Sequence, residues 1–518
     1  MVEKEVPGVA IGLVDGQKVV WAKGFGFSNL TARTPVTADT IFSLQSISKT
    51  YSATAFMRAV DRKLIDLDDR LDDEMPKFSI HDRFGGSQVK RITMRHLLSH
   101  WSGICQEAPI GNNYGEWHCS FKQHVLSIQD SWLRAPVGTR YRYSNPGFDL
   151  AGYALSLRLR KPFEDVMQSE LLTPLGMTDS TYRRSEIEKS PRLATGYLDL
   201  KSPVPPLEIP MVAAGGLFST VNDMTKYVRF QLADGKISGK QWISKEALAT
   251  MRTPQFNGGR RERGYGIGIQ SRPYHGGRLC THGGGGYGFG TLQSWMPDYQ
   301  LGVVILTNGD QGGDLSEEIA DLALTGMIRG KKGNLPDEGP YVRDPRPTVI
   351  LSPAKLHRLE GVYKATSGLA EFKVEDGQLH YHRQRSNVAL FARSGSESTD
   401  EKQTQSFRFD LSSDGWAKGV LQLGNVGPDY MVLNERLGEV KGPDQTQWKE
   451  FVGEYKATAY GQATTQKVIL RNGYLFWGDT IKLLPYRDGL FFTVDGEAVA
   501  FLGKNRMTYG NRQFKRNP

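Results

Sequence analysis

The chain carries, near its start, the stretch Ile41-Phe42-Ser43-Leu44-Gln45-Ser46-Ile47-Ser48-Lys49-Thr50. Within it, Ser46 and Lys49 are spaced as Ser-x-x-Lys, and on a helix these two positions lie on one face, one turn apart. A serine hydroxyl is a weak nucleophile at neutral pH and needs a base beside it. A lysine amine can be that base when burial or a neighbouring cation lowers its pKa. Because the pattern also occurs on ordinary solvated helices, the remaining chain must decide its meaning.

A second stretch, Tyr143-Ser144-Asn145, follows the predicted turn Pro136-Val137-Gly138-Thr139. A tyrosine beside a lysine ammonium has its phenolate stabilised by that charge, and it could then take the serine proton. The amide of Asn145 offers a donor and an acceptor, either for a substrate carbonyl or for holding Lys49.

A third stretch, Thr281-His282-Gly283-Gly284-Gly285-Gly286, lies at the end of a predicted strand. Glycines allow a substrate backbone to approach the strand edge closely, and backbone N–H groups at such an edge can stabilise an oxyanion. A phosphate-binding loop is excluded, because no helix follows the glycines and no Gly-Lys-Ser/Thr occurs. His96 and His100, spaced as i and i+4, are interpreted as structural histidines because no third metal ligand accompanies them.

Taken in order, the three stretches resemble the motifs of the penicillin-recognising serine hydrolases. The resemblance is strongest to the class C β-lactamase-like branch, which includes D-aminopeptidases, D-Ala-D-Ala carboxypeptidases and esterases, and it covers residues 7–330. Flanking segments agree with it, namely Ile92–Gly103, Pro174-Leu175-Gly176-Met177 and Gly215-Gly216-Leu217.

The resemblance implies that Ser46 attacks a carbonyl and forms an acyl-enzyme, which water then releases. It implies that Lys49 and Tyr143 share the proton transfers, without settling which is the base, and that Asn145 orients the reacting groups. The N–H groups of Ser46 and Gly285 would form the oxyanion hole. Along the third motif, His282 would belong to the catalytic set, and Gly283 and Gly284 would bind substrate.

Two departures from the family pattern affect these expectations. In β-lactamases the third motif usually begins with lysine, whereas this chain has His282, which is mostly neutral at pH 7 unless its pKa is perturbed. This favours neutral or amine-bearing substrates over anionic penicillins. The family also usually has a helix before the first strand, and only a few residues precede that strand here. We therefore expect that the N-terminus is shortened, and any signal sequence would have been lost together with the missing segment.

The order of predicted elements indicates an α+β domain over residues 1–333, with strands on either side of a helical middle. The helix carrying Ser46 is predicted to run to about Arg62, and a later one from Asp149 to Leu159. A proline- and charge-rich linker is predicted at 334–353. An internal repeat then matches Leu359–Thr366 with Phe451–Thr458, which predicts two small antiparallel β-barrels at 354–440 and 446–518. This layout is similar to that of bacterial D-aminopeptidases.

Composition excludes several classes of protein. The 518 residues carry a net charge of +9, but the basic residues are scattered and no nucleic-acid motif accompanies them. No apolar run is long enough to span a membrane, and no signal peptide is present, so a cytoplasmic location is expected. Three cysteines are too few for a disulfide framework, and no metal-ligand spacing occurs. We expect no cofactor and no metal.

The sequence thus predicts a serine hydrolase of amide bonds, acting on small molecules or on short or D-residue-containing peptides, in the manner of a D-aminopeptidase. A carboxylesterase or acyltransferase is the alternative, since the same acyl-enzyme serves any acceptor. A β-lactamase and a catalytically silent binding protein are less favoured. A homodimer is compatible with the chain.

Overall fold

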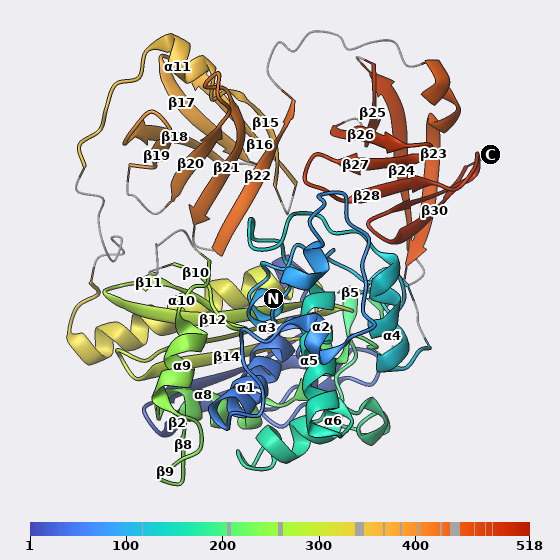
Figure 1. The fold of residues 1–518 in the computed structure, drawn as a ribbon. Helices are drawn as coiled ribbons and strands as arrows, with labels where there is room; N and C mark the ends of the chain where they lie inside the picture. Colours follow the sequence, from blue (N-terminus) through green and yellow to red (C-terminus); the bar gives the residue numbers. More distant parts are fainter. Residues whose placement is uncertain are drawn as a thin grey trace.

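A computed structural model shows an N-terminal domain of mixed helices and strands with two β-barrels on one side of it (Figure 1). The structure describes residues 1–518 except 116–117, 205–208, 257–262, 337–345, 366–367, 384–385, 402–404, 425–426, 436–445, 460–461, 472, 479 and 518. The expected α+β domain followed by two closed antiparallel barrels is confirmed. The predicted boundaries stay predictions, because residues 337–345 of the linker and the junction between the barrels lie outside the described residues.

The N-terminal domain is built on an eight-stranded antiparallel sheet in the order β10-β11-β12-β13-β14-β1-β2-β3. The strands are β1 (Gly8–Asp15), β2 (Lys18–Asn29), β3 (Thr34–Pro35), β10 (Gly264–Tyr265), β11 (Gln270–Tyr274), β12 (Gly277–Gly286), β13 (Phe289–Met296) and β14 (Leu301–Thr307). Because β1 pairs with β14, with Val9 opposite Thr307, the first strand lies in the middle of the sheet beside the last one.

Helices cover both faces of this sheet. Alternate residues of a strand point to opposite faces, and in β14 this sends Val303 and Ile305 toward α10 (Gly312–Lys332). The intervening Val304 and Leu306 join the larger core on the opposite face, where α8 (Val221–Leu232) packs. A side chain at Gly12 of β1 would come within 2.6 Å of Val221 on α8, so the glycine permits this close packing.

The helical middle lies beside the sheet. It contains α1 (Ser48–Asp61), α2 (Leu71–Glu74), α3 (Met94–Leu98), α4 (Phe121–Ser127), α5 (Asn145–Leu159), α6 (Phe163–Met167), α7 (Val212–Gly215) and α9 (Lys245–Arg252). Two-stranded ribbons join β4 (Phe42–Ser43) to β7 (Phe218–Ser219), β5 (Tyr197–Asp199) to β6 (Ser202–Pro203), and β8 (Lys236–Ile237) to β9 (Lys240–Gln241). Within the described part of the chain, no helix combines the length and apolar character needed to cross a bilayer.

Two helix boundaries differ from the predicted ones. Ser46 lies in a 3₁₀ turn, Gln45–Ile47, and α1 begins after it at Ser48. The helix predicted from Asp149 starts earlier, at Asn145, because the Ser144 hydroxyl accepts the Gly147 N–H and Pro146 suits the first turn. The second motif therefore lies at the beginning of α5, where its side chains are held rigidly.

The first barrel follows the short helix α11 (Pro353–His357). It closes through β15 (Gly361–Ala365), β16 (Gly368–Glu375), β17 (Gln378–Arg383), β18 (Ser386–Ala392), β19 (Glu397–Thr399), β20 (Ser406–Leu411), β21 (Ala417–Gly424) and β22 (Gly427–Glu435). The second closes through β23 (Gly453–Ala459), β24 (Gln462–Arg471), β25 (Tyr474–Trp477), β26 (Ile481–Arg487), β27 (Leu490–Thr493), β28 (Ala498–Phe501), β29 (Arg506–Tyr509) and β30 (Arg512–Arg516).

The sequence repeat corresponds to a repeated structural detail. In the first barrel, the hydroxyl of buried Tyr363 donates to the Leu359 carbonyl at 2.8 Å. In the second, the hydroxyl of buried Tyr455 donates to the Phe451 carbonyl at 2.9 Å. Each bond satisfies the one polar atom that the tyrosine brings into the barrel core, so the two units begin in the same way.

The second barrel contacts the N-terminal domain through a buried ion cluster. Arg134, in the loop after α4, contacts Asp495 at 2.6 Å and Glu497 at 3.0 Å, and its side chain is only 5% exposed. Next to this cluster, the amide of Asn511 donates to the Glu107 carbonyl at 2.9 Å. The barrel therefore supports the loop that carries Glu107.

Candidate active site

Ser46 is in contact with both candidate bases. Its Oγ accepts hydrogen bonds from Nζ of Lys49 at 3.0 Å and from the hydroxyl of Tyr143 at 2.9 Å. Lys49 is fully buried and also donates to the carbonyl of Ala214 at 2.9 Å. Its ammonium lies 4.9 Å from the centre of the Tyr143 ring. The structure thus brings together the three residues that the first two motifs predicted, from the 3₁₀ turn, α1 and the start of α5.

The turn that presents Ser46 has an unusual backbone. Gln45, the preceding residue, has a φ of +52°, in the left-handed region that residues with a side chain rarely adopt. Such conformations persist only where the surroundings hold them in place, and they cluster at functional sites. Here the Gln45 side chain donates to the Ser43 hydroxyl at 2.8 Å, and Ser48 donates to the Gln45 carbonyl at 2.6 Å.

Asn145 is held by a residue that the sequence did not reveal. Its Nδ2 donates to Oε1 of Glu107 at 2.7 Å, and that carboxylate also accepts from Asn113 at 2.8 Å. Burial raises the pKa of Glu107, and these hydrogen bonds partly offset the effect. The buried Oδ1 of Asn145 accepts no hydrogen bond within the described part of the chain. Oδ1 is the atom of the Asn145 amide that these contacts leave without a partner.

The glycine strand lies against the serine turn and alternates in exposure. Gly283 and Gly285 are exposed, whereas His282 and Gly284 are buried. A side chain at Gly284 would come within 2.1 Å of the Leu44 carbonyl and 3.1 Å of the Ser46 nitrogen. The structure thus places Gly284 against the serine turn, while Gly283 and Gly285 line the cavity beside Ser46. This arrangement brings the two predicted oxyanion donors, Ser46 and Gly285, close together.

His282 is held as a neutral ring. Its Nδ1 lies 2.7 Å from the Gly283 carbonyl, which can only accept, so Nδ1 carries the proton. Its Nε2 then accepts the hydroxyl of Tyr265 at 2.8 Å. Burial, with a contribution from the Lys49 charge, lowers the pKa of His282 to about 3. The third motif therefore supplies no cation to the cleft, and the His282 ring, held by Tyr265, lines the cavity as a neutral group.

The histidines at 96 and 100 have structural positions. His96 completes a capping box at the start of α3 with Thr93, and burial lowers its pKa to about 4. The His100 ring packs 4.2 Å from the ring of Tyr143 and accepts the Ser144 N–H at 3.1 Å. Burial holds the pKa of His100 well below its usual value, with a contribution from Lys49. His100 is a neutral support for the tyrosine.

These three neutral histidines predict a loss of stability in acid. Their folded-state pKa values lie below the unfolded value of 6.5, so the unfolded chain binds more protons as the pH falls from about 6.5. Although burial opposes it, the hydrogen bond to Asp149 raises the pKa of His124, which therefore acts in the opposite sense. We expect the free energy of unfolding to fall between pH 6.5 and pH 5.

Urea denaturation at a series of pH values measures this slope. The variant His282→Asn removes one of the three titrating rings and should make the slope shallower, whatever its effect on stability at pH 7. The exposed histidine of α11 provides the control, and His357→Asn should leave the slope unchanged. A slope that is equal in all three proteins would show that His282 is protonated in the folded state.

A cavity of about 380 Å³ extends from Ser46 along the glycine strand to α10. Tyr143, His282, Gly283 and Gly285 line its end near the nucleophile. Gln270, Arg272, Tyr274, Leu279, Thr281, Leu292, Ser294, Glu317, Ala320, Asp321 and Leu324 line the remainder. Beyond residue 281, β11 no longer pairs with β12, so a substrate backbone can lie along the free strand edge.

Residues 1–326 match the family model described as Beta-lactamase. The chain belongs to the β-lactamase family. Members of this family are serine hydrolases, and the contacts of Ser46 with Lys49 and Tyr143 fit that chemistry. The matched region ends within α10 and includes every residue of the candidate site.

Curated relatives and solved structures are similar to this β-lactamase-family protein. It is 30% identical over 317 residues to the unguisins hydrolase ungD' of Aspergillus campestris, covering 58% of either chain. It is 32% identical over 324 residues to β-lactamase-like protein 4 of Dictyostelium discoideum, covering 59% of this chain and 52% of the other. Thus it spans only a little over half the length of these two relatives. Penicillin-binding protein 4 of Amycolatopsis lactamdurans is 26% identical, with 69% and 95% covered.

Two solved structures have a similar fold. The octameric penicillin-binding protein homologue from Pyrococcus abyssi aligns with a TM-score of 0.56 and 25% identity, covering 83% of this chain and 97% of the other. A class C β-lactamase from Rhodobacter sphaeroides aligns with a TM-score of 0.51 and 22% identity, covering 63% of this chain and 96% of the other. The alignment with the Pyrococcus abyssi protein covers more of the chain than the catalytic domain alone. The alignment with the class C β-lactamase covers a fraction of the chain close to that of the catalytic domain.

Proposed function

We propose that the protein hydrolyses amide bonds of short peptides through an acyl-enzyme on Ser46, with a preference for substrates that carry a free amine and a D-residue. The observation that carries the proposal is the double contact of Ser46 Oγ with Lys49 and Tyr143, beside an unpaired glycine strand edge. An activated serine next to backbone donors is the arrangement that acyl transfer requires.

In the proposed reaction, Ser46 Oγ attacks the substrate carbonyl while Lys49 as a neutral amine, or Tyr143 as a phenolate, takes its proton. The N–H groups of Ser46 and Gly285 stabilise the resulting oxyanion. The proton then passes to the leaving amine, and water attacks the acyl-enzyme with the same base assisting. Asn145 holds the substrate through its unbonded Oδ1, with Glu107 fixing the orientation of the amide.

The preference for an amine follows from the charges around the cleft. His282 is neutral, so the third motif has no fixed cation for a substrate carboxylate. Arg272 on β11 also lines the cavity, and its charge counteracts the rise in the pKa of Glu317, so the α10 end carries charges of both signs. At the α10 end, the cavity is lined by Glu317 and Asp321, and Asp321 also accepts from Tyr274 at 2.5 Å. Glu317 is solvent-exposed, and the protein packed around it raises its pKa, with the neighbouring Asp314 charge adding to the effect. A substrate ammonium at this end would pair with a carboxylate. The names of two relatives, a hydrolase of unguisins and a penicillin-binding protein, are consistent with amide-bearing substrates.

The test is a panel of substrates with the full chain. A fluorophosphonate probe reports a reactive serine, with Ser46→Ala as the background. Turnover is then measured for D- and L-alanyl p-nitroanilides, their N-acetylated forms, p-nitrophenyl acetate and a chromogenic β-lactam. We expect labelling of the wild type and fastest turnover of the free-amine D-alanyl substrate. Turnover of the acetate alone would identify an esterase. Hydrolysis of the β-lactam alone would identify a β-lactamase, and absence of both labelling and turnover a silent binding protein.

Glu317 provides a sharper test of the amine preference. The variant Glu317→Gln should raise KM for the free-amine p-nitroanilides by about tenfold, the value of one charged hydrogen bond. It should leave p-nitrophenyl acetate turnover unchanged. The adjacent residue is the matched control, because Glu318 pairs with Lys4 at 3.0 Å and does not line the cavity. Equal KM changes in Glu317→Gln and Glu318→Gln would show that Glu317 does not bind the substrate amine.

A further inference from the structure

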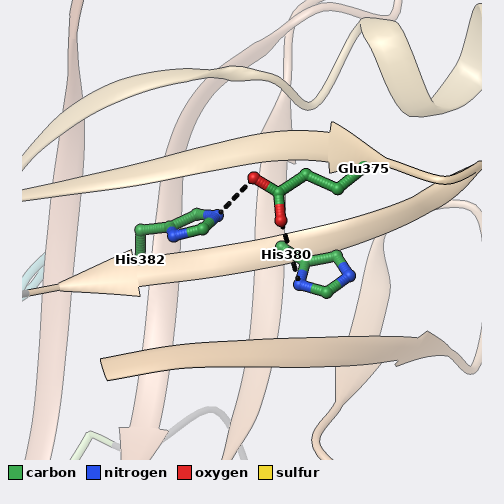
Figure 2. A group of neighbouring side chains, drawn as sticks. All are labelled: Glu375, His380 and His382. Carbon is green, nitrogen blue, oxygen red and sulfur yellow. Dashed lines mark ion pairs between the residues drawn. The ribbon is translucent and has the colours of Figure 1, made fainter. Parts of the chain in front are cut away.

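Two histidines and a glutamate meet on the outer wall of the first barrel, at the hairpin of β16 and β17 (Figure 2). In β17, Leu379 and Tyr381 point into the barrel core and are 2% and 3% exposed. Strand alternation therefore places His380 and His382 side by side on the outer face. Glu375 ends the neighbouring strand, and its carboxylate lies between the two imidazoles.

The spacing of the three ligand atoms fits a small metal ion. Glu375 Oε1 lies 3.2 Å from Nε2 of His382, and Glu375 Oε2 lies 3.6 Å from Nδ1 of His380. All three groups offer ligand atoms within 4.8 Å of one another. A tetrahedral zinc ion with bonds of about 2.0–2.1 Å holds its ligand atoms about 3.3 Å apart. The two carboxylate–imidazole separations, one from each oxygen of Glu375, lie on either side of that value, and the separation of the two imidazole nitrogens is below 4.8 Å.

The orientation of His382 supports the same interpretation. Its Nε2 is shielded from solvent, yet it makes no hydrogen bond although a carboxylate oxygen lies 3.2 Å away. The contact has the distance of a hydrogen bond without its geometry. This arrangement is expected when the His382 imidazole and the Glu375 carboxylate both point at one bound metal ion and not at each other.

One neighbour competes for the site. The Oδ1 atom of Asn387 lies 2.8 Å from Nδ1 of His380, and its Nδ2 donates to Glu375 at 3.5 Å. An amide oxygen can itself bind a divalent ion, so Asn387 can contribute a fourth ligand or give way to water. The cluster would otherwise be a hydrogen-bonded network on the barrel surface.

We propose that Glu375, His380 and His382 form a binding site for one borderline divalent metal ion of the zinc class. Imidazole nitrogens favour Zn²⁺ and its transition-metal neighbours, whereas Mg²⁺ and Ca²⁺ prefer oxygen ligands throughout. The site is separate from the active site, since none of the three residues lines the cavity at Ser46. The bound ion joins β16 to β17 and stabilises the folded barrel by mass action. The sequence did not suggest it because the carboxylate comes from the adjacent strand.

Calorimetric titration of ZnCl₂ into the chelator-treated full chain tests the proposal. We expect saturable binding of one ion per chain and no binding of MgCl₂. His380→Ala and His382→Ala should each weaken binding by at least about tenfold. His357→Ala provides the control, because it removes an exposed histidine that pairs with Glu360 in the same domain. It should bind zinc like the wild type.

A melting curve supplies an independent readout. Zinc should raise the melting temperature of the wild type and of His357→Ala, but not that of His382→Ala. The unliganded melting temperatures show whether each variant folds. Three outcomes would overturn a site formed within a single chain. They are the absence of saturable zinc binding, equal zinc affinity in all variants, and a stoichiometry of one zinc ion per two chains.

Discussion

Replacing Ser46 by alanine is expected to lower kcat by about 10⁶-fold and to abolish labelling by a fluorophosphonate. The reason is that the hydroxyl forms the covalent bond, and no other described side chain makes its pair of contacts with Lys49 and Tyr143. The side chain is half-buried and small, so the variant should fold, and an unchanged circular-dichroism spectrum is its control.

Lys49→Met should lose nearly as much activity as Ser46→Ala. Methionine fills the same buried space but removes the ammonium that contacts Ser46 and Ala214. Tyr143→Phe keeps the ring that packs on His100 and removes only the 2.9 Å contact, so we expect a loss of about 10²- to 10⁴-fold. The pH profiles of these two variants then show which group is the base.

Groups that act together lose activity non-additively. The double variant Ser46→Ala/Lys49→Met should therefore be no less active than Ser46→Ala alone. The measurement is steady-state turnover of one p-nitroanilide by the wild type, the two single variants and the double variant. Losses that multiply would contradict a shared mechanism. Retention of turnover in Ser46→Ala would remove Ser46 as the nucleophile.

The sequence predicted the parts of this site that are local in the chain. Ser46 and Lys49 are three positions apart, and the short spacing places both in one pocket. The alternation of β12 was not predicted: the sequence assigned Gly283 and Gly284 together to the substrate, whereas Gly284 is buried against the serine turn and Gly283 is exposed.

Residues that act from a distance could not be predicted in the same way. Glu107 reaches Asn145 from a loop 38 positions earlier, and no pattern in that loop marks it. Arg134 and Asp495 are 361 positions apart. Their contact depends on how the second barrel docks, which hydrophobic periodicity does not encode. The barrels themselves were predictable from their repeat, but the contact of the second barrel with the Glu107 loop was not.

Replacing Arg134 by alanine is expected to destabilise the protein by about 3 kcal/mol. The substitution leaves Asp495 and Glu497 buried, at 2% and 9% exposed, without their closest cation. Although burial opposes it, the charge of Arg134 lowers the pKa of Asp495. Removal of the Arg134 charge should therefore raise the pKa of Asp495, so that this carboxylate takes up a proton at higher pH. Urea denaturation at pH 7 measures the change.

Two comparisons separate this buried cluster from an ordinary surface pair. Lys467→Ala removes an exposed contact with Glu454 at 3.6 Å in the same barrel and should cost less than about 1 kcal/mol. The triple variant Arg134→Met/Asp495→Asn/Glu497→Gln removes these three charges together and should recover part of the stability, since the penalty arises from unpaired buried charges. Lys364 and Arg142, whose charges also lower the pKa of Asp495, stay buried nearby and limit the recovery. Equal costs for Arg134→Ala and Lys467→Ala would mean that water reaches the cluster.

Docking of the second barrel should also affect catalysis. Asn511 on that barrel holds the Glu107 carbonyl, and the Glu107 carboxylate holds Asn145 at the active site. Under conditions where Arg134→Ala is still folded, we expect kcat to fall while fluorophosphonate labelling of Ser46 persists, because the nucleophile and its bases lie on other elements. A variant with full kcat despite the lost stability would show that Asn145 keeps its position without the barrel. The second barrel would then contribute to folding alone.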